Sequence, residues 1–372
     1  MSVVTRSSFL AVAAALSVQV VLGQDIGQPG FTALYDKHIP YNQIPYQVDP
    51  DPNATRGPQA GYNICNSTTA TQTSECQTMI FNAIDDFCLW SSPQPDQPIS
   101  DTEAVEVAWC TSNKYGARTI PQGTLTGVQF LTTPDYIEMI AFINQTLINL
   151  PADDFGGELD PHGADLRGNP MGGLVYSTHF TNDSSLGQVS DWNEFIGGGQ
   201  MCIKLCNPSS PNRANLCENR YDLIGLSFNC PNQAQDNVFE TCDSDNQDPV
   251  GTYTTNGQVM TWSQPAVGPI TTLPYSVRIP SSSNCQTLQS TDLYTSLLAV
   301  ASPSASGSSG ASATPTASGG AKTSGGSSGA ASRTSSGGAA PTGASQGNAA
   351  SVNGVSAFAT VFGVLAAVAF LA

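Results

Sequence analysis

The sequence has little charge, few basic residues and almost no histidine. Of its 372 residues, 11% are charged, 12 are Lys or Arg, and three are His. The basic residues form no cluster, which argues against the phosphate-contacting surface that a nucleic-acid partner requires. Cys202-x-x-x-Cys206 could suggest a metal site, but no CxxC or HxxxH pair is present to support zinc. We therefore expect no nucleic-acid partner and no cofactor.

Acidic and aromatic residues are missing from a long tract at 301–353, which is rich in Ser, Gly, Ala and Thr. Such a segment cannot bury enough apolar surface to offset the entropy lost on ordering. We predict a disordered, O-glycosylated stalk. The match to G-x-S-x-G at Gly325–Gly329 lies in this tract, where neither the strand nor the helix of a nucleophile elbow can form, so it is accidental.

Both ends of the chain are predicted to be processing signals. Residues 1–23 combine Arg6 with the apolar run Phe9–Leu22, which is typical of a secretory signal peptide and would leave Gln24 first. Residues 354–372 are apolar and carry no basic flank. Small residues precede them, with Gly343 and Asn348 as candidate attachment sites, which is the pattern of a GPI signal. The alternative at either end is a membrane-spanning helix.

The body, residues 24–300, is acidic and contains every cysteine. It has nine basic and 29 acidic residues, a net charge of −20. An even number of cysteines in a secreted chain predicts five disulfides, paired mainly within an N-terminal group of four and a C-terminal group of six. The ten are Cys65, Cys76, Cys88, Cys110, Cys202, Cys206, Cys217, Cys230, Cys242 and Cys285. One large domain or two closely packed halves would fit this length.

Four Asn-x-Ser/Thr sequons predict N-glycosylation in a secreted chain. They are Asn53, Asn66, Asn144 and Asn182. Because Asn144 follows an apolar strand candidate, its modification requires the end of that strand to be exposed.

Residue patterns predict a mainly β fold, a disulfide-stapled β-sandwich or barrel with one or two short helices; α+β is the alternative. Alternation or apolar runs predict strands at Val105–Trp109, Tyr136–Ile143, Leu174–Phe180, Met201–Cys206 and Ile224–Phe228. If Met201–Cys206 is a strand, its two cysteines lie about 13 Å apart and take different disulfide partners.

Local signals predict one hairpin and two helices. Asn256-Gly257 favours a type I′ turn within Thr252–Trp262. Ser74 and Gln77 form a capping box, and Ile80, Ile84 and Phe87 follow at helical spacing, so a helix is predicted there. A short helix is also expected at Asp191–Phe195.

The densest polar segment, Asp153–Asn169, is the candidate for chemistry. It contains Asp153, Asp154, Glu158, Asp160, His162, Asp165 and Arg167. Carboxylates could bind calcium, and His162 could bind a transition metal or act as a base, but the spacing is not that of an EF-hand. We favour a structural loop pinned by hydrogen bonds. No catalytic residue or metal ligand is assigned. His38 and His179 are expected to be packing or surface residues.

Several stretches together resemble a known family. They are IDDFCLW at Ile84–Trp90, AWCTSNKYGARTIPQGTLTGVQFLTTPDY at Ala108–Tyr136, DPHGADLRGNPMGG at Asp160–Gly173, PNQAQD and VFETC within Pro231–Cys242, and STDLY at Ser290–Tyr294. With these, the body resembles the secreted, GPI-anchored mannoproteins of basidiomycete fungi, also called macrophage-activating glycoproteins or immunoreactive mannoproteins. The resemblance implies a cell-surface or wall location and heavy mannosylation, and it brings no catalytic residues.

Two main hypotheses and one weaker one follow. The first is a structural or interaction glycoprotein, attached to the membrane by a GPI lipid, whose partners are wall polysaccharide or lectins that bind its glycans. The second is a wall-modifying carbohydrate-active or metal-dependent enzyme, which the Asp153–Arg167 loop would serve. The third is a carbohydrate-binding module that uses Trp109, Trp192 or Trp262 as an exposed platform. We favour the first.

Overall fold

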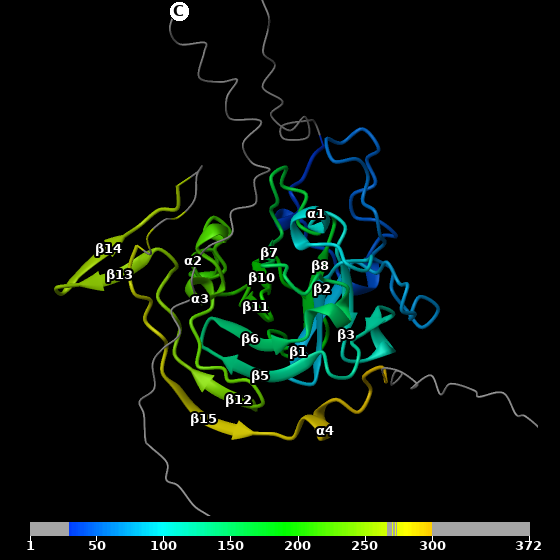
Figure 1. The fold of residues 1–372 in the computed structure, drawn as a ribbon. Coiled ribbons are helices and arrows are strands. Elements are labelled where there is room, and N and C mark those ends of the chain that lie inside the picture. The colour runs from blue at the N-terminus through cyan, green and yellow to red at the C-terminus, as the bar shows by residue number, and fades with distance from the viewer. Residues whose placement is uncertain (1–29, 266–269, 271, 273, 300–372) are drawn as a thin grey trace, which may run out of the picture. The chain divides into compact units, whose positions relative to one another are not determined.

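Strands in three sheets make up most of the regular structure (Figure 1). The computed structural model describes residues 30–265, 270, 272 and 274–299. The predicted signal peptide, stalk and GPI signal, with Gly343 and Asn348, lie outside these residues. The mainly β fold class is confirmed.

The first large sheet has six strands in the order β4-β3-β2-β1-β8-β9. Pairing is antiparallel except between β1 and β8 and between β3 and β4. The bounds are β1 Thr78–Ala83, β2 Asp86–Ser91, β3 Val107–Cys110, β4 Arg118–Thr119, β8 Leu174–Ser177 and β9 Gly187–Gln188.

The second large sheet has seven strands in the order β15-β12-β5-β6-β11-β10-β7, and only β5 and β12 pair in parallel. The bounds are β5 Leu125–Thr132, β6 Tyr136–Ile143, β7 Gly157–Leu159, β10 Trp192–Gly197, β11 Gln200–Cys206, β12 Phe239–Ser244 and β15 Ser282–Thr287. The bounds of β6 coincide with the predicted apolar strand.

The two large sheets pack against each other, as in a β-sandwich. Phe81 of β1 stacks on Phe130 of β5, with ring centroids 5.7 Å apart, and Trp90 of β2 lies 6.2 Å from Trp192 of β10. The buried carboxyl of Glu194, on β10, accepts a hydrogen bond from the Trp90 backbone N–H at 2.9 Å. The apolar alternation of both sheets therefore converges on one core.

The helices are single turns that lie between the strands, before β1 or after β15. The α-helices are α1 Ile99–Thr102, α2 Arg213–Leu216, α3 Leu226–Asn229 and α4 Ser290–Leu293, and the 3-10 turns are η1 Leu34–Asp36, η2 Tyr41–Gln43, η3 Asn113–Tyr115, η4 Gln145–Ile148 and η5 Asp222–Ile224. Within the described ranges no helix has the length and apolar character needed to cross a bilayer.

The helix predicted after Ser74 is wrong, because the segment forms the β1–β2 hairpin. A bulge between Phe81 and Ala83 shifts the strand register. Ile80, Ile84 and Phe87 are buried, but they lie on β1, in the turn and on β2, so their helical spacing is coincidental. Both strands are buried on both faces, so the polar-out alternation that would have identified them is missing.

Two further expectations are corrected and one hairpin is confirmed. Asp191–Phe195 is not helical, since β10 begins at Trp192 and pairs with both β11 and β7. Ile224–Phe228 is not a strand but the end of η5 and the start of α3, divided by Gly225 with φ of 83°. The third sheet is the predicted hairpin, β13 Thr252–Thr255 and β14 Gln258–Thr261. Its turn residues Asn256 and Gly257 have φ of 51° and 75°, as a type I′ turn requires.

All ten cysteines form disulfides, as predicted, and every pair stays within its sequence group. The pairs are Cys65–Cys76, Cys88–Cys110, Cys202–Cys230, Cys206–Cys217 and Cys242–Cys285. Cys202 and Cys206 share β11 and take different partners, as the strand geometry requires.

A buried ion pair lies inside the second sheet. The Lys204 ammonium on β11 lies 3.0 Å from the Glu138 carboxylate on β6, and the two side chains are 0% and 1% exposed. Lys204 also donates to the Gln247 side chain at 2.5 Å and to the backbone oxygen of Asn229, and it lies over the Tyr136 ring. Its three N–H groups therefore have partners, which a buried ammonium needs.

Candidate functional site

An acidic cleft opens beside the edge strand β7. It has a volume of about 650 Å³, within the range of about 300–1,000 Å³ typical of ligand sites. Four carboxyl groups line it, those of Glu103, Glu158, Asp160 and Asp222, and no Lys, Arg or His does. They come from the end of α1, from β7 and the loop after it, and from η5. The fold thus gathers like charges from three distant segments.

Phe155 projects at the edge of the cleft from a tightly held turn. Its side chain is 90% exposed. The neighbouring Asp154 fixes the turn, because its carboxylate accepts hydrogen bonds from the backbone N–H of Gly156 and of Ile99, both at 3.0 Å. At Gly156, with φ of 85°, a Cβ would lie 1.6 Å from the Ile196 oxygen, so only glycine fits. The backbone that carries the exposed ring is therefore fixed.

Glu158 forms part of the cleft wall and is 7% exposed. Among the described residues, neither of its carboxyl oxygens accepts a well-formed hydrogen bond. Burial raises its pKa well above the usual range, and the charges of Asp160 and Asp222 add to the rise, while the Asn193 amide opposes it. A carboxyl with a raised pKa stays protonated, and therefore uncharged, at higher pH.

The other acids of the cleft are held by hydrogen bonds to the fold. Glu103 accepts from the Asn169 amide at 2.9 Å, and burial raises its pKa, with the charge of Asp160 adding to the rise. Asp160 accepts from the backbone N–H of Gly163 at 3.1 Å. Asp222 accepts from the Gln264 amide. Each keeps acceptor capacity for a ligand.

The acids of the cleft are spread too widely to form a ready-made metal cage. In the part of the chain that the structure describes, only two groups of three possible ligands lie within 4.8 Å of one another, and both consist of a Glu with a disulfide-bonded cysteine pair. They are Glu138 with Cys202 and Cys230, and Glu240 with Cys242 and Cys285. A cysteine in a disulfide offers no thiolate to a metal.

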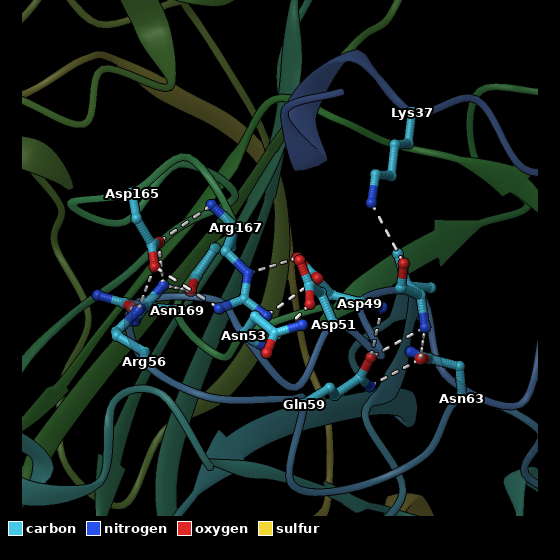
Figure 2. A network of polar contacts seen from close by, with 12 residues as sticks. Lys37, Asp49, Asp51, Asn53, Arg56, Gln59, Asn63, Asp165, Arg167 and Asn169 are labelled. Carbon is cyan, nitrogen blue, oxygen red and sulfur yellow. Dashed lines mark hydrogen bonds and ion pairs between the residues drawn. The ribbon is translucent and has the colours of Figure 1, made fainter. Parts of the chain in front are cut away.

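The rest of the polar loop pins the N-terminal segment, as the favoured interpretation expected (Figure 2). The Arg56 guanidinium donates to both carboxylate oxygens of Asp165, at 2.8 and 2.5 Å, and to Asn169 at 2.6 Å. Arg167 donates to both carboxylate oxygens of Asp49, at 2.7 and 3.0 Å. Such bidentate pairs fix geometry as well as charge. Asp165 and Arg167 are therefore structural.

The single histidines lie outside the cleft lining. His162 stacks on Tyr35 with centroids 4.5 Å apart, and His179 contacts Phe180 edge to face. His162 Nδ1 lies 3.3 Å from Oδ1 of Asp160, a residue of the cleft lining, so His162 stands behind that carboxyl and does not itself line the cleft.

The predicted tryptophan platform is wrong for two of its three members. Trp109 and Trp192 are buried in the core. Trp262 is half-buried and lies against Tyr221, with centroids 5.8 Å apart. The exposed aromatic residue at the cleft is instead Phe155.

The structure adds residues that the sequence did not single out. Glu103 and Asp222 join Glu158 and Asp160 only through the tertiary fold. Neither Glu103 nor Asp222 could be identified from the sequence, because each is one isolated acid among many in an acidic body. The one signal in the sequence was a Phe placed between Asp154 and Gly156, since an aromatic residue inside a polar loop can be exposed for binding.

All four sequon asparagines lie at the surface. Asn53, Asn66, Asn144 and Asn182 are exposed, and Asn144 directly follows β6. The surface requirement for modification at Asn144 is met, and occupancy stays a prediction.

Two curated proteins match the chain, both from Mycosarcoma maydis. Appressorium protein ROW1 is 37% identical over 261 residues, which cover 69% of this chain and 58% of ROW1. Appressorium protein ROW2 is 35% identical over 242 residues, which cover 64% of this chain and 78% of ROW2. The chain therefore belongs to this family of fungal appressorium proteins. No protein-family model matches it, and no solved structure does.

Proposed function

We propose that this chain is a glycosylated, GPI-anchored protein of the fungal cell surface, with a structural or interaction role at infection structures. The observation that carries the proposal is the match to two proteins named for the appressorium, found in a body whose cysteines are all disulfide-bonded. Disulfides persist in oxidising compartments and on cell surfaces. The exposed sequons and the resemblance to mannoproteins support mannosylated glycans that lectins can bind.

Fractionation of fungal cells that carry a tagged chain tests the location. Phosphatidylinositol-specific phospholipase C or wall glucanase should release the protein, and endoglycosidase should lower its apparent mass. A stop codon after Ala350 should send it into the medium. A peptide from Val361–Phe370 in the mature protein would contradict the anchor.

The acidic cleft favours a second role, carbohydrate binding by the body. An exposed aromatic ring beside several carboxyl groups is an arrangement that suits sugars, which offer apolar ring faces and many hydroxyl donors. Pull-down on chitin, β-glucan and mannan, with Phe155→Ala as the control variant, tests this role. Equal retention of the unaltered protein and of Phe155→Ala would contradict carbohydrate binding in the cleft.

A further inference from the structure

We propose that the acidic cleft binds an oligosaccharide that carries protonated amino groups, such as a glucosamine oligomer. The inference deepens the carbohydrate-binding role and rests on it. The cleft offers negative charge and exposed apolar side chains, and a cationic sugar matches both.

The first observation is the sign of the charge. Four acids line the cleft and no basic residue does, within a body of net charge −20. The Arg56 guanidinium adjoins the cleft beside Gly163 and Asn169, and it is engaged by Asp165 and Asn169. An anionic sugar would meet mostly like charge, which specific recognition avoids. Protonated amines along the ligand would instead face Asp160, Glu103 and Asp222.

The second observation is the apolar edge of the cleft. Phe155 is 90% exposed and Leu223 is 54% exposed, and both line the cleft. Large apolar side chains that are exposed to solvent beside a polar cleft indicate a binding surface. A pyranose ring can stack its C–H face on an aromatic ring. An aromatic face also attracts ammonium groups, so a simple polyamine is the control that separates stacking of a sugar ring from a cation–π contact.

Calorimetric titration of the full-length glycosylated protein at pH 5.5 tests the proposal with four probes. They are a glucosamine hexamer, its N-acetylated form, a neutral cellohexaose and spermidine. We expect the glucosamine hexamer to bind at least about tenfold more tightly than each of the others, since a lost charge contact or a lost stacking contact changes affinity by roughly that factor.

Variants assign the binding to the cleft. Phe155→Ala and Asp222→Asn should each weaken binding of the glucosamine hexamer about tenfold. Matched controls are Val259→Ala, an exposed apolar residue on β14, and Asp243→Asn, an exposed acid on β12. Neither lines the cleft, so both should bind as the unaltered protein does. Circular dichroism and the unfolding temperature confirm that each variant is folded.

Each other outcome overturns the proposal. Equal binding of the acetylated hexamer removes the role of charge, and equal binding of spermidine removes the role of the sugar ring. No binding, or equal losses in the control variants, removes the cleft as the site. If the acetylated or neutral hexamer binds and the glucosamine hexamer does not, carbohydrate binding stands and only the charge inference fails.

Discussion

Replacing Lys204 by Met should be among the most destabilising single changes in the body. Lys204 is 0% exposed, and its ammonium is bonded to Glu138, Gln247 and Asn229. Met fills a similar volume but leaves a buried carboxylate and two buried oxygens without a donor. Breaking a buried pair from one side costs about 3–5 kcal/mol. Domains are stable by only about 5–15 kcal/mol, so a large share of the folding free energy is lost.

Guanidinium unfolding followed by tryptophan fluorescence measures this loss. Lys114→Met is the matched control, because Lys114 also pairs with a carboxylate, Asp86 at 2.8 Å, but is 53% exposed. An exposed pair contributes less than about 1 kcal/mol. The double variant Lys204→Met with Glu138→Leu should recover much of the loss, since no charge is then left buried.

The pH dependence gives a second check on the same variant. Burial raises the pKa of Glu138. Without Lys204, this carboxyl can avoid the desolvation cost of a buried charge by binding a proton. The stability gap between Lys204→Met and the unaltered protein should therefore narrow as pH falls from 7 to 4. Equal losses in Lys204→Met and Lys114→Met, or a gap that widens toward acid, would refute this account of the ion pair.

Three further outcomes are expected. Burial raises the pKa of Glu106, Glu158 and Glu194 well above the usual range. The folded state therefore holds protons that the unfolded chain releases above about pH 4.5, so the unfolding temperature should fall as pH rises from 4.5 to 8, and less steeply in Glu194→Gln. Alkylation without reduction, read by mass spectrometry, should label no cysteine; two or more labelled positions would contradict the pairing. Gly156→Ala should lower stability by more than about 1 kcal/mol in thermal unfolding, because its Cβ meets the Ile196 oxygen.

The sequence predicted those parts of the fold that rest on local chemistry. The apolar run Tyr136–Ile143 is β6, and Asn256-Gly257 makes the turn between β13 and β14. The cysteine pairing stayed within the two sequence groups. A helix was predicted where the β1–β2 hairpin lies. A bulge and burial on both faces remove the alternation of apolar and polar residues that identifies a strand. A tertiary environment overrode the capping signal there.

The sequence indicated two of the four acids of the cleft. Glu158 and Asp160 lie in the polar segment Asp153–Asn169, while Asp165 and Arg167 in the same segment bind the N-terminal part of the chain. Sequence spacing cannot separate these roles, because each is decided by which distant residue packs opposite. Glu103 and Asp222 reach the cleft from α1 and η5 for the same reason.

The disulfide between Cys242 and Cys285 gives the body a mechanical property. It links β12 to β15, a strand at the edge of its sheet and the last strand of the described chain. A pull on the C-terminal end would first break the contacts that Leu298 and Tyr294 make with Ile120 and Ile84. It would then break the hydrogen bonds of β15 one after another, starting at Thr287, until the force reaches Cys285. From there the covalent bond transfers tension directly to β12, which lies inside the sheet beside β5. The segment between the two cysteines, whose sequence separation is 43, is bypassed by the force. The sandwich should thus extend only slightly under load and keep the acidic cleft intact.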